Sequence, residues 1–281
     1  MSSPERRRSV IIGVSVVMAV VVGVGACSAG SIGASGTGGT TDVGQSEPTA
    51  SRVDTGTGSD ARSITASRVV IGRSVQGREI VANAVGDPGA RKVLVVIGSM
   101  HGTELGGVKV ARRVMKAGAP AGTRIWVVPN LNPDGARTRT RTNARGVDLN
   151  RNAPDLWRTG PRDLVYPGPS AASEPETQAM MSFLGDVRPD LVLSFHQALN
   201  GVDSYGNKDP RLIKWLGRKF RLPVKRFDCS GICRGTLTGW FNANQPGSAV
   251  TIEFPARVSG SRAKAWARSV RQIAAGLRDV A

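Results

Sequence analysis

Two patterns of apolar residues recur along the chain beyond residue 61. Short continuous runs rich in Val, Ile and Leu are typical of strands that are buried on both faces of a sheet. Between these runs, apolar residues spaced three or four apart predict helices. The strands are expected at 93–97, 124–128, 190–195 and 249–254, and the helices at 106–117, 174–184, 211–220 and 263–277. Because strands and helices alternate, we expect an α/β fold with a largely parallel central sheet.

Local signals add detail to this pattern. Residues 67–85 predict a hairpin whose turn contains Gly77, a residue that accepts a positive φ. Segment 129–135 is predicted to be a loop. The helix at 174–184 is expected to begin after Ser173 as its N-cap, with Pro175 in its first turn.

The start of the chain follows neither pattern. Three consecutive arginines from Arg6 precede an apolar run of mainly Val, Ile, Ala and Gly at 9–26, which is typical of an export signal. The run closes on Val-Gly-Ala-Cys, ending at Cys27, and this resembles the lipobox of bacterial lipoproteins. We therefore predict that residues 1–26 are a signal peptide and that Cys27 is lipidated. The alternative is a transmembrane anchor, because ~18 apolar residues approach the length that spans a bilayer.

Residues 28–61 consist mainly of Gly, Ser, Thr, Asp and Ala without apolar periodicity. Such a segment buries too little surface to offset the entropy lost on ordering it. We predict a flexible tether with a root-mean-square reach of about 30–35 Å. The folded domain is then 62–281. Under either interpretation of the N-terminus, this domain is attached to the cell membrane and faces outside the cytoplasm, in the cell envelope.

The chain is strongly basic, with a formal net charge of +17. A charge of this size favours acidic partners such as nucleic acid, anionic lipid or an acidic polymer. The arginines are scattered, however, and few aromatic residues lie among them to stack on bases, so we expect no nucleic-acid partner. A basic surface facing an anionic cell envelope fits the predicted export. We expect a monomer.

Residues that can bind metal stand where the apolar strands end. His101 and Glu104 follow the first buried-type strand, His196 follows another, and Glu253 lies near the end of the last. In open α/β sheets, ligands gather outside the carboxyl ends of the strands, so these distant segments are expected to converge. Each signal alone is weak, because a single His after a strand is often structural and a Glu there often pairs with an Arg. The conjunction carries the prediction, since both histidines of the chain follow such strands.

Two His and one carboxylate form a catalytic zinc set that leaves the fourth position for water. Zinc lowers the pKa of that water and polarises a scissile carbonyl. Hydrolysis of an amide also needs a base that takes a proton from water and passes it to the leaving amine, and Glu253 is the candidate. The sequence therefore predicts a hydrolytic site with one zinc ion.

Longer motifs lie between and around these segments, and together they resemble a known family. They are His-x-x-Glu at 101–104, Asn-Pro-Asp-Gly at 132–135, Thr-Arg-x-Asn at 140–143, Gly-Val-Asp-Leu-Asn-Arg-Asn at 146–152, His196, and Thr-x-Glu at 251–253. The same motifs occur in this order in the M14 zinc carboxypeptidases. The resemblance covers the chain from about Ser67 to the C-terminus and implies a three-layer α/β/α sandwich with a mixed, largely parallel central sheet. Carboxypeptidase A is itself a type example of the ligand set, so the zinc assignment rests on the resemblance too.

Within this family the chain is most similar to the bacterial murein peptide amidases, which are γ-D-glutamyl-diaminopimelate amidases. The segments that carry this similarity are 166–169, 173–177, 195–198, 235–240 and 246–255. It implies zinc-dependent hydrolysis of an amide bond in cell-wall muropeptides, between D-glutamate and a diamino acid. The alternatives are a metallocarboxypeptidase acting on ordinary peptides, an N-acylamino-acid deacylase, and an inactive wall-binding lipoprotein.

The resemblance also implies the roles of individual residues. His101, Glu104 and His196 hold the zinc ion. Glu253 acts as general base and then as general acid. Arg141, from the Thr-Arg-x-Asn motif, stabilises the oxyanion of the tetrahedral intermediate.

Further roles follow from the Asp-Leu-Asn-Arg motif. Asn150 and Arg151 bind the terminal carboxylate of the substrate, because an Arg fork suits a carboxylate. Asp148 orients a ligand His from behind. The chain departs from the digestive carboxypeptidases, which carry a mobile Tyr near the base: Tyr166 and Tyr205 are both distant in sequence from Glu253. Closure over the substrate must therefore differ, and residues 235–242 are a candidate wall of the pocket.

Two more groups of residues complete the predictions. Cys229 and Cys233 are four positions apart, which in an exported protein indicates a short disulfide loop. Metal binding by this pair is the less favoured alternative, since the chain offers no further Cys or His for it. Arg137 and Arg139 are interpreted as part of a solvated, period-two strand without a catalytic role.

Overall fold

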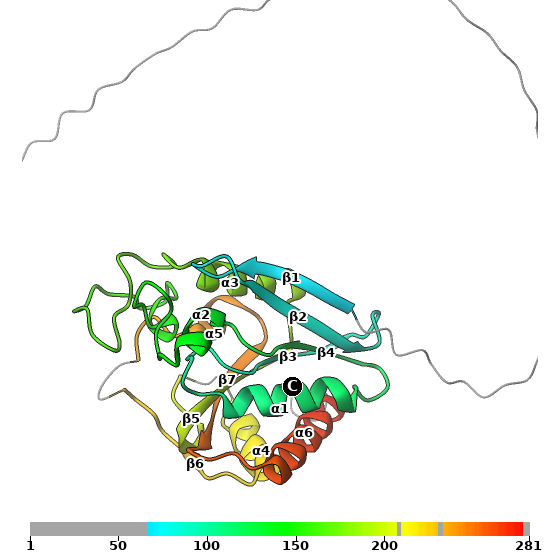
Figure 1. Cartoon of the computed structure of the whole chain (residues 1–281). Coiled ribbons are helices and arrows are strands. Elements are labelled where there is room, and N and C mark those ends of the chain that lie inside the picture. The colour runs from blue at the N-terminus through cyan, green and yellow to red at the C-terminus, as the bar shows by residue number, and fades with distance from the viewer. Residues whose placement is uncertain (1–66, 207–208, 230–232, 278–281) are drawn as a thin grey trace, which may run out of the picture. The chain divides into compact units, whose positions relative to one another are not determined.

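A mixed sheet lies at the centre of the structure, a computed structural model that describes residues 67–206, 209–229 and 233–277 (Figure 1). Within these residues the sheet has seven strands, in the order β1-β2-β4-β3-β5, with β6 and β7 both pairing with β5. The strands are β1 Ser67–Arg73, β2 Glu79–Gly86, β3 Lys92–Ile97, β4 Thr123–Val128, β5 Leu191–Asp203, β6 Val224–Lys225 and β7 Ser248–Pro255. The predicted signal peptide, lipidation site Cys27 and tether lie outside the described residues.

The pairing confirms a mixed, largely parallel sheet. Strand β3 runs parallel to both β4 and β5, and β5 runs parallel to β6 and β7. The predicted hairpin forms β1 and β2, which pair antiparallel, and β2 pairs antiparallel with β4. The long parallel part places the carboxyl ends of β3, β5 and β7 at one edge.

Helices cover both faces of the sheet, so the fold has the three predicted layers (Figure 1). Helices α1, α4 and α6 pack on one face, and α3 and α5 pack on the other. The helices are α1 Gly106–Ala117, α2 Pro133–Thr138, α3 Pro175–Val187, α4 Pro210–Phe220, α5 Leu237–Asn244 and α6 Gly260–Ala275, with a 3-10 turn η1 at Leu149–Arg151. None of the helices in the described ranges is long and apolar enough to cross a bilayer.

The continuous apolar strands contribute side chains to two separate hydrophobic cores, one on each face of the sheet. Along β3, Leu94 and Val96 belong to the cluster beneath α1, α4 and α6, whereas Val95 and Ile97 belong to the cluster beneath α3 and α5. Successive side chains of a strand point to opposite faces, so a strand covered on both sides must be apolar at every position. This is why these strands could be predicted as continuous runs.

The structure corrects the prediction for segment 129–142. A short helix, α2, forms in the predicted loop because Pro133 occupies its first turn and the Asn132 side chain accepts a hydrogen bond from the Gly135 N–H. The period-two strand is wrong, since Arg137 lies in the last turn of α2 and Arg139 ends the helix with φ 57°. Both side chains are nevertheless exposed, as expected of solvated residues.

The N-terminus of α3 is also corrected, by one residue. Its N-cap is Glu174 rather than Ser173, whose hydroxyl instead donates to the Glu174 carboxylate. Glu174 and Glu176 are fully buried, and both accept hydrogen bonds from the Asn143 side chain, at 2.7 and 3.1 Å. These contacts hold the segment that follows Asn143 against α3, and that segment carries part of the site described next.

Candidate metal centre and pocket

Four predicted site residues meet at the carboxyl edge of the sheet. His196 on β5 lies directly opposite Glu253 on β7 in the strand register. His101 and Glu104 stand on the loop that follows β3, another strand that pairs with β5. Segments that are far apart in sequence therefore converge, because the three strands are parallel neighbours.

Close backbone contacts hold the loop at 98–104. The Ser99 hydroxyl donates to the His101 carbonyl oxygen at 2.6 Å. A Cβ on Gly102 would lie 2.0 Å from the carbonyl carbon of Gly135. Any side chain at position 102 would thus push the loop away from α2 and displace the neighbouring His101.

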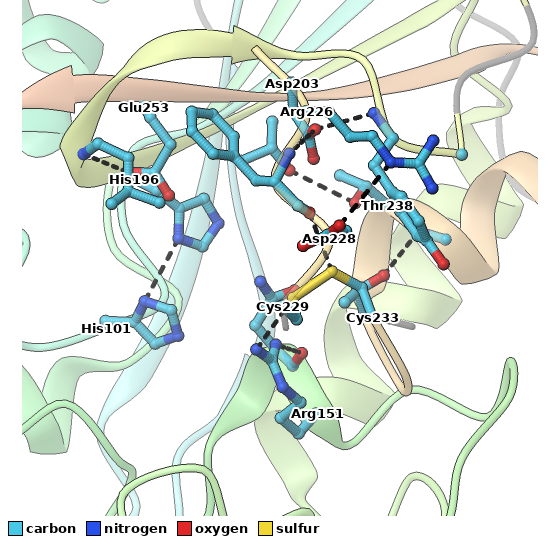
Figure 2. Close-up of a pocket in the computed structure, with 18 of the residues that line it drawn as sticks. His101, Arg151, His196, Asp203, Arg226, Asp228, Cys229, Cys233, Thr238 and Glu253 are labelled. Carbon is cyan, nitrogen blue, oxygen red and sulfur yellow. Dashed lines mark hydrogen bonds and ion pairs between the residues drawn. A yellow bond between two sulfur atoms is a disulfide. The ribbon is translucent and has the colours of Figure 1, made fainter. Parts of the chain in front are cut away.

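Three donor atoms point at one another within this loop and β5. Nδ1 of His101 lies 2.9 Å from Glu104 Oε1 and 3.3 Å from His196 Nδ1, and Figure 2 shows a nitrogen of each ring directed at the other ring. Nδ1 of His196 lies 3.2 Å from Glu104 Oε2. The three side chains are buried, and their ligand atoms all lie within 4.8 Å of one another. Two imidazole nitrogens and one carboxylate oxygen fit zinc, which is the cofactor of this site.

The outward-facing nitrogen of each ring is held by a polar partner. Nε2 of His101 is 2.9 Å from Asp148 Oδ1, and Nε2 of His196 is 3.1 Å from the Ser194 hydroxyl. Such contacts fix ring orientation and leave Nδ1 directed at the metal position. Asp148 is fully buried, and it stands where the resemblance places a residue that orients a ligand His.

Electrostatics favour a cation at this position. Burial raises the pKa of Glu104, but hydrogen bonds and charge from His101 and His196 outweigh it and hold that pKa well below its usual range. Burial likewise raises the pKa of Asp148. The hydrogen bond from His101 and the positive charge of Arg141 outweigh burial, so the pKa of Asp148 is lowered overall. Burial lowers the pKa of His101, yet its two carboxylate partners raise it overall. The cluster therefore holds two ionised carboxylates in a buried place, where negative charge attracts a metal cation.

Glu253 differs from these carboxylates. It is buried, and its Oε2 accepts a hydrogen bond from the Leu199 N–H at 3.2 Å. Burial raises its pKa, and the nearby charge of His196 opposes this without reversing it. A strand-end carboxylate whose proton is held more tightly than usual, beside the metal ligands, is suited to proton transfer.

Arg141 reaches the centre from the loop after α2. Its Nη1 donates to Glu104 Oε1 at 3.1 Å, and its Nε and Nη2 donate to Asp148 Oδ2 at 3.2 and 3.0 Å. These contacts use three of its five N–H groups, which leaves two for another acceptor. The half-buried guanidinium lines the pocket and so has N–H groups available to a bound substrate.

Asn150 and Arg151 lie farther along the same pocket wall. The Asn150 side-chain oxygen accepts from the Leu237 N–H at 3.3 Å, which leaves its amide N–H groups to donate elsewhere. Arg151 Nη1 donates to the Asn150 carbonyl oxygen at 2.7 Å, and Nη2 contacts Cys229 Sγ at 3.4 Å. Cys229 is disulfide-bonded to Cys233, and Figure 2 shows this bridge directly beside Arg151.

One pocket of about 810 Å³ is lined by the three metal ligands and by Glu253, Arg141, Asn150 and Arg151. Residues of α5 and its N-cap form part of its wall, among them Thr236, Thr238 and Asn242, within the segment predicted for that position. Tyr205 also lines the pocket, although it is distant in sequence from Glu253. Strand β5 bends after His196. Glu253 therefore pairs with two residues of β5, first His196 and then Gly201, and the bend brings the chain back towards the site.

Several lining residues were not predicted to contribute, and two of them, Gln197 and Asp203, make contacts that shape the site. Gln197 ties three elements together: its N–H donates to Glu104 Oε2 at 3.1 Å, its side-chain oxygen accepts from the Gly106 N–H, and its side-chain nitrogen donates to the Pro255 carbonyl oxygen. Asp203 accepts from the Tyr205 N–H at 2.8 Å, and burial raises its pKa. An acidic residue two positions before Tyr205 gave no signal without knowledge of the bend in β5.

The similarity to known proteins agrees with this site. The family model for zinc carboxypeptidases matches residues 59–207. Murein peptide amidase A of Escherichia coli (strain K12) is 34% identical over 169 residues, which cover 54% of this chain and 67% of the relative. The protein of the same name from Vibrio campbellii (strain ATCC BAA-1116) is 33% identical over 177 residues, or 57% and 68% of the two chains. The crystal structure of murein-tripeptide amidase from Escherichia coli O157 matches with a TM-score of 0.63 and 28% identity, over 74% of this chain and 91% of that chain.

Proposed function

The chain belongs to the zinc carboxypeptidase family, and we propose that it is a zinc-dependent amidase that cleaves cell-wall muropeptides, between D-glutamate and a diamino acid. The observation that carries the proposal is the convergence of His101, Glu104 and His196 beside Glu253 in one pocket. The similarity to two murein peptide amidases supports the substrate class.

The residues of the pocket divide the work of hydrolysis. Zinc, when bound, supplies a Lewis acid that activates water and polarises the amide carbonyl. The Glu253 carboxylate takes a proton from the attacking water and passes it to the leaving nitrogen. Arg141 donates its remaining N–H groups to the oxygen that gains negative charge. The buried surroundings strengthen both effects, because charges interact more strongly where water is excluded.

The part of the pocket away from the metal centre is chemically suited to a charged leaving group. A substrate with a free carboxylate beside the cleaved bond suits Asn150 and the Arg151 fork. Diaminopimelate, the diamino acid that the resemblance implies, carries a further amino group and a further carboxylate at the end of its side chain. Asp203, Arg226 and Asp228 line the pocket and supply charges of both signs for such an end. The first suits an ammonium group because its carboxylate is half-buried beside Tyr205.

An ordinary metallocarboxypeptidase uses the same metal set, so the charged wall is what separates the two functions. A pocket that binds apolar C-terminal residues is lined by apolar side chains. Charged side chains in its wall would weaken the binding of such residues, because these charges would have to lose their water. We therefore place hydrolysis of ordinary peptides second.

We also propose that the protein is a lipid-anchored, monomeric component of the cell envelope. The support is the sequence of residues 1–27, with its basic start, apolar run and terminal Cys27. Metabolic labelling with a palmitate analogue tests this: the label should appear in the wild type and be absent from Cys27→Ser.

The decisive test is incubation of the full chain with the tripeptide L-alanyl-γ-D-glutamyl-diaminopimelate, with zinc and with a chelator, followed by mass spectrometry. The expected product is free diaminopimelate, formed only with zinc. A standard tripeptide of neutral residues, at the same concentration, is the control. Release of neutral C-terminal residues at an equal or higher rate would replace the amidase by a carboxypeptidase, and zinc-independent release would reject both.

A further inference from the structure

The three helices that cover one face of the sheet share an unusual composition. Helices α1, α4 and α6 each carry four Lys or Arg residues, twelve in all, and none of them carries an Asp or a Glu. The twelve residues, here called the basic face, are Lys109, Arg112, Arg113, Lys116, Arg211, Lys214, Arg218, Lys219, Arg262, Lys264, Arg268 and Arg271. The three helices form one layer (Figure 1), so their charges add to a single field.

These charges point to solvent and are not neutralised within the described part of the chain. Eleven of the twelve are exposed, and Lys219 is half-buried. Arg211 contacts Asp209 at 3.4 Å, and the other eleven are in no ion pair with any described residue. The apolar sides of the same helices are buried in the hydrophobic core. Core packing explains why the inner positions are apolar, but it does not require a single sign of charge on the outer ones.

The basic face is separate from the catalytic pocket. No residue of α1, α4 or α6 lines that pocket. A partner on the basic face therefore leaves the route to His101, His196 and Glu253 open. Substrate binding in the pocket therefore does not account for the positive charge of the basic face. A role in positioning the enzyme against a partner accounts for it.

The chemistry of the face selects its partner. None of the exposed large apolar side chains of the described residues lies within the three helices, so neither insertion into a bilayer nor an apolar protein interface is favoured. A second copy of the chain would present the same sign of charge and be repelled. The charges spread over three adjacent helices instead of lining one groove, which suits an extended array of phosphate groups better than a single linear polymer.

We infer that the basic face docks on the anionic lipid headgroups of a membrane surface. Such binding is electrostatic, acts without insertion and fades within a Debye length of the surface. It does not depend on the catalytic proposal. A lipid anchor at Cys27 would hold the domain near the same surface, so the two kinds of attachment would act together. Docking would turn the pocket edge of the domain in a defined direction.

A matched pair of charge-reversal variants tests the inference. The test variant is Arg112→Glu, Arg218→Glu and Arg268→Glu, one change on each helix. The control variant is Arg137→Glu, Arg158→Glu and Arg188→Glu, three exposed residues outside the three helices and in no ion pair with a described residue. Both variants change the net charge equally. All proteins are full chains that carry Cys27→Ser, so that lipidation does not mask the effect, and the chain with this change alone is the wild type of the comparison. Because the apolar run at 9–26 can bind any bilayer, binding is always expressed relative to vesicles of phosphatidylcholine alone.

Binding is measured by co-sedimentation with vesicles of phosphatidylcholine alone and with vesicles that also contain phosphatidylglycerol. Partitioning onto the anionic vesicles, relative to phosphatidylcholine alone, should fall by about 100-fold in the test variant, because each basic residue near such a surface contributes a several-fold factor. In the control variant it should fall by less than about threefold, and in about 1 M salt the wild type should lose binding too. Circular dichroism confirms that both variants are folded.

Three results would overturn the inference. Equal losses in the two variants would mean that only the net charge matters. Equal binding of the wild type to both kinds of vesicle would exclude anionic headgroups. Displacement of the wild type from anionic vesicles by a small excess of a soluble glycerol-phosphate polymer, with no competition in the reverse direction, would assign the face to a wall polymer instead.

Discussion

Charge is held in opposite ways at the metal centre and on the basic face. At the carboxyl edge of the sheet, Glu104 and Asp148 are buried, and each contacts a His and Arg141. On α1, α4 and α6 the charges are exposed, and eleven of twelve have no ion-pair partner among the described residues. A buried charge that loses its partner is costly, whereas an exposed one is solvated by water. The metal centre should therefore respond steeply to one substitution, and the basic face only to several together.

The largest effect is expected from His196→Ala. It removes one of three metal donors and leaves the others too few to hold zinc. Zinc content should fall from about one ion per chain to near zero, and hydrolysis of the diaminopimelate tripeptide should be lost. Thermal unfolding adds an independent measurement, since a metal that binds only the folded state stabilises it. The wild type should melt at a higher temperature with zinc than with a chelator, and the variant should melt at the same temperature in both. Full zinc content in the variant would remove His196 from the ligand set.

Glu253→Gln should have the next largest effect, on turnover alone. The amide keeps the shape of the side chain and cannot take the proton from water, so kcat should fall by about 10²–10⁴-fold. Zinc content should stay at the wild-type value, because the ligands are untouched. Metal analysis beside steady-state kinetics separates this outcome from that of His196→Ala. An active Gln variant would move the base role to another group.

Asp148→Asn probes the residue behind a ligand. The change removes the charge that holds the His101 ring and Arg141, so zinc affinity should weaken by about 10–100-fold. Competition with a chromogenic chelator measures this affinity. Unchanged affinity would show that the contact with His101 does not position the ligand.

Asp134→Asn is the matched control, because Asp134 is equally buried but contacts Ser74, Gln76 and Arg78 instead of a ligand. Zinc affinity should not change, while the free energy of unfolding at neutral pH should fall by about 1–3 kcal/mol. Burial raises the pKa of Asp134, but these partners lower it overall. A carboxylate whose pKa is lower in the folded than in the unfolded state stabilises the fold at pH values above its unfolded-state pKa, about 3.9. This contribution to stability is lost as the pH falls. The stability difference between wild type and variant should therefore shrink below about pH 4.

Asp203→Asn should have a smaller effect, confined to substrate choice. Loss of its charge should raise KM for the diaminopimelate tripeptide by about tenfold, as expected for one charge-assisted contact. The KM for a tripeptide with a neutral C-terminal residue should not rise, and zinc content should be unchanged. Equal changes for both substrates would mean that Asp203 only shapes the pocket.

The strands and their ligands were predictable because each depends on local sequence. A continuous apolar run needs no knowledge of its neighbours, and His101 and His196 stand directly after such runs. The edge at which they meet follows from parallel pairing alone. The family motifs added Asp148 and Arg141, which the structure places against the ligands.

The remaining features depend on contacts between distant segments. The bend in β5 places Tyr205 and Asp203 in the pocket, and no pattern between His196 and Asp203 marks it. The N-cap at Glu174 depends on burial against Asn143. The basic face was also invisible as a unit, because its charges are scattered along the sequence and gather only when three helices form one layer.

The smallest catalytic effect is expected on the basic face, and this is the sharpest test of the comparison. Arg112→Glu, Arg218→Glu and Arg268→Glu together change the net charge by six units, far more than any single change at the metal centre. Exposed side chains without partners contribute within about 0.5 kcal/mol each to stability, so the free energy of unfolding should stay close to the wild-type value or rise as like-charge repulsion is relieved. With a soluble tripeptide, kcat/KM should remain within about twofold, because screening over a Debye length of about 8 Å isolates the pocket from this layer. Urea unfolding and steady-state kinetics measure both quantities. A loss of turnover as large as that of Asp148→Asn would show that the two charge systems are coupled.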